Sequence, residues 1–171
     1  MPLISDLRSL WCALHDLRDA VLPVRLLVVE DRPETVAPHP VQALSDSLDD
    51  VFGRLQEAID SLSTVLDDNE PRSNEQVVTA LARCNKAMLE FCREWTAEVG
   101  SHHRLGQLTR SAIERGPAWR SWAKSTVEGV HGCETARYRV QLGLLVCWQS
   151  LAELAGGAEK SPCTSAATKE R

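Results

Sequence analysis

Few residues in this sequence have the types and spacing that metal binding or acid–base catalysis requires. Glu128 and His131 stand three apart, a spacing at which two side chains project from one side of a helix and can share a metal ion. Both flank the apolar stripe of their helix, and the chain holds no second Glu-x-x-His sequence. His102 and His103 are adjacent in a connecting segment without a third ligand at useful spacing. We therefore expect no metal site and no cofactor.

Arg8 and His15 offer a different kind of acid–base chemistry. They are seven residues apart and are therefore nearly superposed on one helical face. An arginine, six intervening residues and a histidine resembles the motif of HEPN ribonucleases, which are also small helical bundles. The resemblance covers these two residues only, and in that family the motif usually lies on a late helix, whereas here it is near the N-terminus. It would make His15 the acid/base and Arg8 the group that stabilises phosphate charge.

Nucleophilic catalysis has no visible candidate. The six cysteines are widely scattered and none forms a Cys-x-x-Cys pair. In a reducing compartment such residues usually serve as small buried apolar side chains. The chain also lacks a glycine-rich phosphate loop and a Gly-x-Ser-x-Gly elbow. We therefore expect a protein that is not an enzyme, with a HEPN-like ribonuclease or another catalytic or metal-binding bundle as the alternative.

The segment that carries Arg8 and His15 has the periodicity of an amphipathic helix. Its apolar residues alternate four and three apart and so share one stripe, which comprises Leu3, Leu7, Leu10, Leu14, Leu17, Val21, Val24 and Val28. Pro23 falls within this pattern and removes one backbone donor. We therefore expect a kink near Asp19 to Pro23, or a break into two pieces.

Similar stripes predict a second helix from about Pro40 to Asp67 and a third that ends near Val99. Ser73 and Gln76 are spaced for a capping box, in which each side chain accepts a hydrogen bond from the other residue's backbone amide, at the start of the third helix. Gly100 can adopt the left-handed conformation that closes a helix. A short helix is expected between residues 101 and 116, and a long last helix begins at Pro117.

These elements predict an all-α fold, arranged as an antiparallel, up-down-up-down four-helix bundle. The first helix is kinked, and the short extra helix lies between helices three and four. We expect one domain over residues 1–157 and a disordered tail over residues 158–171. The arrangement would gather one layer of large side chains at a single level, formed by Val28, Val41, Trp95, Trp119 and Trp122.

Composition and charge narrow the class of protein. The formal net charge of −5 argues against a dedicated nucleic-acid binder, which normally shows a basic excess. No apolar run approaches the roughly 20 residues needed to span a bilayer, and the N-terminus lacks the basic region of a signal peptide. We therefore expect a cytoplasmic protein that binds neither membranes nor nucleic acid.

Two sets of apolar residues lie off the core stripes of their helices. The second half of the first helix carries Leu22, Leu26 and Val29, and the last helix carries Leu142, Leu145 and Val146. A helix that is apolar on several faces must bury them against something, either within its own fold or in a partner. The sequence therefore favours a non-enzymatic interaction module, an adaptor or regulatory subunit of a larger bacterial assembly. Its partner would be another protein or a second copy of itself.

Overall fold

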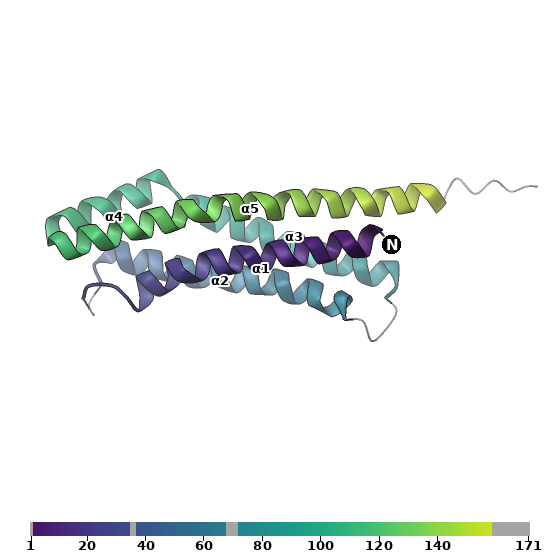
Figure 1. Cartoon of the computed structure of the whole chain (residues 1–171), viewed down its shortest axis with the longest axis horizontal. Helices are drawn as coiled ribbons and strands as arrows, with labels where there is room; N and C mark the ends of the chain where they lie inside the picture. Colours follow the sequence, from purple (N-terminus) through teal and green to yellow (C-terminus); the bar gives the residue numbers. More distant parts are fainter. Residues whose placement is uncertain (1, 35–36, 68–71, 159–171) are drawn as a thin grey trace, which may run out of the picture.

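A computed structural model describes residues 2–34, 37–67 and 72–158, and within these ranges the regular elements are all helices (Figure 1). They are α1 (Pro2–Val29), α2 (His39–Leu66), α3 (Asn74–Glu94), the π-helical turn η1 (Trp95–Val99), α4 (His102–Arg115) and α5 (Pro117–Ala158). The all-α prediction is confirmed. The last helix reaches one residue into the predicted tail, and the rest of that tail, 159–171, lies outside the described residues.

The long helices lie lengthwise beside one another, with α1 packed against both α2 and α5, and α2 against α3 (Figure 1). Hydrogen bonds between elements show their directions. Trp122 of α5 bonds the backbone of Leu27, whereas Ser150 bonds Asp6, so α1 and α5 are antiparallel. The shorter α4 packs against α5 and α2 at one end, and at the other end α5 continues past the start of α1 (Figure 1).

Helix α1 is continuous across Pro23, so the predicted possibility of a break is wrong. All eight residues of the predicted stripe are buried, whereas Pro23 and Asp19 are exposed. The proline ring therefore stands on the solvent side, where the carbonyl of Asp19 that loses its amide donor can bond water instead. Core packing on the opposite side keeps the two halves of the helix in register.

The end of α3 differs from the prediction. Its start has the expected capping box, with the Gln76 amide donating to Ser73 Oγ and the Ser73 amide to Gln76 Oε1. At its other end the chain makes a π-helical turn, and Gly100 has φ −88°, which is not left-handed. A Cβ at Gly100 would lie 3.1 Å from Trp95 Nε1, so this position needs a small residue because the indole packs over it.

The predicted single layer of large side chains is wrong for Trp95. Trp119 and Trp122 do pack edge to face, with ring centroids 5.3 Å apart, and Trp122 Nε1 donates to Leu27 O at 2.7 Å. Trp95 instead donates to Glu134, twelve residues beyond Trp122 and about 18 Å further along α5. The separation arises because η1 and α4 extend the chain past the end of α3, so α5 begins further out than a direct connection would place it.

Two glycines set the spacing of the α1–α5 pair. A Cβ at Gly129 would lie 2.9 Å from Val24 Cγ2, and one at Gly143 would lie 3.1 Å from Leu10 Cδ1 and 3.5 Å from its Cα. Gly132, on the same helix, has nothing within 4 Å of such a Cβ. Helix propensity alone would make each glycine weaken α5, but Gly129 and Gly143 are needed for close packing.

This difference predicts opposite effects of the same substitution. Gly132→Ala should raise the free energy of unfolding by about 0.5–1 kcal/mol through helix propensity alone. Gly129→Ala should lower it by about 1–3 kcal/mol, because the new methyl meets a buried, β-branched Val24 with little rotamer freedom. Urea unfolding measures both, and Val24→Ala should relieve the Gly129→Ala loss. Equal stabilisation by the two alanines would contradict the close approach.

Candidate functional site

His15 is half-buried on α1, and its ring packs edge-on against Trp11 with centroids 4.0 Å apart. Its Nε2 atom is buried without a hydrogen-bond partner in the described structure. Burial lowers the pKa of His15, and the nearby positive charge of Arg18 lowers it further against the opposing effect of two aspartates. The imidazole is therefore held toward its neutral form.

Arg8 lies on the same flank of α1 and borders an open groove of about 450 Å³ between α1 and α2. The other lining residues are Trp11, Cys12, Ser63, Leu66 and Asp67. Trp11 Nε1 donates to Ser63 Oγ at 3.0 Å, which ties the two helices together beside the groove. The structure thus places both residues of the HEPN-like pair around Trp11, with Arg8 on the groove and His15 against the indole.

The candidate metal ligands are dispersed. Glu128 is exposed and pairs with Lys124 at 4.0 Å, and His131 is exposed as well. His102 and His103 are exposed in the first turn of α4, which is the short helix predicted between residues 101 and 116. Among the described residues, no group of three or more His, Cys, Asp or Glu side chains is arranged to hold a metal ion.

The buried cysteines are chemically quiet. Cys84, Cys133 and Cys147 are buried, as the sequence predicted, whereas Cys12 is exposed. Burial raises the pKa of each of these three thiols to about 12, so they stay protonated at neutral pH. Because the thiolate is the nucleophilic form, the three buried cysteines act as packing residues.

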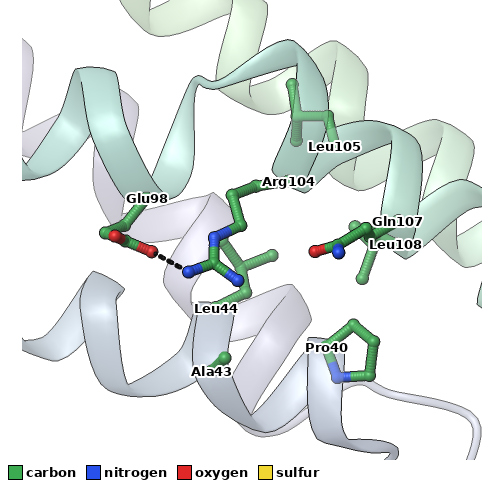
Figure 2. Close-up of a pocket in the computed structure, with 8 residues that line it drawn as sticks. All are labelled: Pro40, Ala43, Leu44, Glu98, Arg104, Leu105, Gln107 and Leu108. Carbon is green, nitrogen blue, oxygen red and sulfur yellow. Dashed lines mark ion pairs between the residues drawn. The ribbon is translucent and has the colours of Figure 1, made fainter.

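A small pocket lies where α4 crosses the start of α2 and the turn η1 (Figure 2). Its lining is Pro40, Ala43, Leu44, Glu98, Arg104, Leu105, Gln107 and Leu108. Its cavity volume is about 10 Å³, space for about one water molecule. The Arg104–Glu98 ion pair, 2.8 Å long, joins α4 to η1 beside the pocket (Figure 2). This pocket is therefore a packing junction and too small for a metabolite.

A polar network that the sequence analysis missed connects η1 to α5. The buried Trp95 donates from Nε1 to Glu134 Oε1 at 3.0 Å, and Arg137 donates to Glu134 Oε2 from Nη2 at 2.6 Å and from Nε at 3.1 Å. Burial by itself would raise the pKa of Glu134, but the hydrogen bonds from Arg137 and Trp95, with the positive charge of Arg137, lower it overall. In the sequence, the three-residue spacing of Glu134 and Arg137 is the signal that could have revealed this ion pair.

The six off-stripe apolar residues remain uncovered in the described structure. The α1 patch, Leu22, Leu26 and Val29, is 36–37% exposed. On α5 the exposed fractions are 44% for Leu142, 67% for Leu145 and 46% for Val146, and the neighbouring Tyr138 is 60% exposed. We name these four residues the α5 patch. Both sets are therefore only partly covered within the described residues.

The two patches are separate surfaces. Trp122 of α5 bonds the backbone of Leu27, so the α1 patch lies level with the early part of α5. Leu142 is twenty residues further along, about 30 Å away on a straight helix. Next to the α1 patch, Arg25 pairs with Asp49 at 2.8 Å and lies over the Phe52 ring. The α1 patch therefore has a polar border, and one partner would need a long contact to reach both patches.

No family model, no curated protein and no solved structure matches this chain. Among the described residues, none of the helices is both long enough and apolar enough to cross a membrane.

The network at Glu134 predicts a pH-dependent stability. Because its folded-state pKa is lowered, ionised Glu134 contributes stability that is present above its ordinary value of 4.5 and is lost as the pH falls through the lowered value. Glu134→Gln should lower the free energy of unfolding at pH 7 by about 1 kcal/mol, a modest loss because the carboxylate is partly exposed.

Thermal unfolding measured from pH 7 to pH 2 checks this. The deficit of the Glu134→Gln protein should shrink as the pH falls, because the wild-type carboxylate also becomes neutral. Glu128→Gln is the matched control, since that exposed carboxylate pairs only at 4.0 Å with Lys124. A deficit that stays constant with pH would show that the charge of Glu134 is not what stabilises the turn.

Proposed function

We propose that this chain is a non-enzymatic interaction module, an adaptor or regulatory subunit of a larger cytoplasmic assembly. The observation that carries the proposal is the exposure of two apolar patches on helices whose core stripes are already buried. Isolated exposed leucines are common on protein surfaces, but clusters at helical spacing on one face are typical of interfaces.

We propose that the helices carrying these patches belong to an antiparallel four-helix bundle. Its four members are α1, α2, α5, and α3 together with η1. Three observations support it. Trp11 bonds Ser63 while Arg25 pairs with Asp49, so α1 and α2 are antiparallel. The α1–α5 pair is antiparallel as described above. Trp95 bonds Glu134 while Cys92 accepts from Gln141, which gives α3 with η1 the opposite direction to α5. Rigid helices of this kind present side chains at little entropic cost to a partner.

Burial of these side chains supplies the binding energy. Complete transfer of a leucine side chain from water to an apolar interface is worth about 1.5–3 kcal/mol. Leu145, which is 67% exposed, retains most of that gain for a partner, whereas Leu26 at 36% retains about a third. The α5 patch is therefore the stronger candidate of the two.

The alternative function is a HEPN-like ribonuclease that uses Arg8 and His15. The observation in its favour is the lowered pKa of His15 beside an open groove bordered by Arg8. A neutral imidazole can accept a proton from a ribose hydroxyl, and a guanidinium can stabilise phosphate charge. The net charge of −5 counts against it, because an RNA-binding surface is normally basic.

The interaction proposal predicts partner loss on charge insertion. Tagged protein is captured from its native host, and bound proteins are quantified by mass spectrometry for the wild type, Leu26→Glu, Leu145→Glu and the control Leu89→Glu. Leu89 serves as the control because it is 60% exposed and lies on α3, outside both patches. We expect at least one defined partner to fall about tenfold or more with Leu26→Glu or Leu145→Glu and to persist with Leu89→Glu. Identical recovery from all four proteins would contradict the proposal.

The enzyme alternative predicts a different result. On our proposal, purified protein leaves single-stranded and structured RNA intact, and His15→Ala changes nothing. Gel analysis of labelled RNA measures this, with His131→Ala as the control because His131 is an exposed histidine on another helix. RNA cleavage that is abolished by His15→Ala and preserved by His131→Ala would contradict the interaction module and support the ribonuclease.

A further inference from the structure

The exposed side of α5 carries an unusually long stretch without charge. Thirteen consecutive residues, from Val140 to Ala152, include no Asp, Glu, Lys or Arg. Within the α5 patch, Tyr138, Leu142 and Leu145 follow one another at intervals of four and three, which places them on one side of the helix. Gln149 continues this line. An interval of four then three is the pattern of a helix that packs lengthwise on another helix.

Opposite charges stand at the two ends of this stretch. Arg139 and Glu153 each lie seven residues from Val146, one on either side, and both are exposed. Because seven residues make nearly two turns, the three residues share one side of α5. Glu153 accepts a long hydrogen bond of 3.4 Å from Gln149, and within the described structure Arg139 has no ion pair. The uncharged stretch is therefore flanked by one positive and one negative group placed symmetrically about Val146, its midpoint.

We propose that the occupant of the α5 patch is the α5 patch of a second copy of this chain, packed antiparallel about a twofold axis beside Val146. This inference rests on the proposed function and names the partner of one of its two surfaces. In that arrangement Arg139 of each copy lies level with Glu153 of the other, the two Leu145 residues lie within one helical turn of each other beside the axis, and Leu142 lies level with Ser150 of the other copy. The contact is isologous, as twofold dimers require.

The charges also decide the direction of pairing. A parallel pair in register would place Arg139 beside Arg139 and Glu153 beside Glu153, and like charges at facing positions are destabilising. The antiparallel pair turns both contacts into attractions. Such rim ion pairs contribute little affinity, but they discriminate between registers. The apolar centre supplies the affinity.

The position of α5 in the molecule permits this contact. Helix α5 lies along one edge and continues beyond the start of α1 (Figure 1). Its inner side is occupied by α1 through Gly129, Cys133 and Gly143, so the patch faces away from the core. The α1 patch, smaller and bordered by the Arg25–Asp49 pair, stays free in the dimer for a different protein.

Sedimentation equilibrium and light scattering test the dimer over a wide concentration range. Wild-type protein should approach twice the chain mass, and Leu145→Glu should weaken dimerisation about tenfold or more. Leu89→Glu, the exposed leucine on α3, should leave the dimer unchanged. Circular dichroism and thermal unfolding establish that each variant is folded. A wild-type chain that stays monomeric throughout, or a dimer that Leu145→Glu does not weaken, overturns the proposal.

Charge reversal tests the direction. Arg139→Glu and Glu153→Arg should each weaken the dimer about threefold to tenfold, and the double reversal should restore it, because the attraction is re-formed with the signs exchanged.

Cysteine crosslinking gives an independent readout in a Cys12→Ser, Cys163→Ser background. Val146→Cys should form an intermolecular disulfide, whereas Thr135→Cys should not, since two copies of residue 135 lie about 33 Å apart in the antiparallel pair. Crosslinking of Thr135→Cys with itself, or no recovery in the double reversal, overturns the antiparallel arrangement.

The outcomes separate the two proposals. A monomeric chain that still loses a captured protein with Leu26→Glu retains the interaction module and overturns the dimer alone. A monomeric chain whose captured proteins are the same in all variants overturns both.

Discussion

The close approach of α1 and α5 is the constraint on which most of this structure depends. Gly129 and Gly143 leave no room for larger side chains against Val24 and Leu10, so the backbone of α5 meets side chains of α1 directly. Dense packing of this kind keeps α1 continuous across Pro23, because eight buried residues on its inner side outweigh one lost hydrogen bond on its outer side. It also orients α5, and therefore decides which of its side chains are left in solvent.

The second constraint acts where α3 ends. The π-helical turn brings Trp95 over Gly100 and within hydrogen-bond distance of Glu134, and that carboxylate is in turn held by Arg137. An indole N–H that is buried needs an acceptor, and a partly buried carboxylate needs a cation, so each member of the network satisfies another. The network links η1 to α5, beside the hydrogen bond that Gln141 of α5 donates to Cys92 of α3.

Helix α5 has two apolar sides of different character. Its inner side includes small residues, such as Gly129, Cys133 and Gly143, that admit α1 between larger buried ones, whereas its outer side carries the exposed residues of the α5 patch. A helix buried on one side only does not require the second set for folding. Exposed fractions of 44–67% leave much of these side chains in water, and that surface contributes nothing to the stability of the monomer until a partner buries it.

The sequence by itself determined the helices, the capping box at Ser73 and the buried stripe of α1, because these follow from local propensity and a period of 3.6 residues. It also identified the six off-stripe residues later found exposed. Only the tertiary structure decided the level of Trp95, the π-helical turn, the network at Glu134 and the different roles of Gly129 and Gly132. These depend on how far one helix slides along another, a distance set by packing between residues remote in the chain. Periodicity assigns a residue to a side of its helix but not to a neighbour across the core.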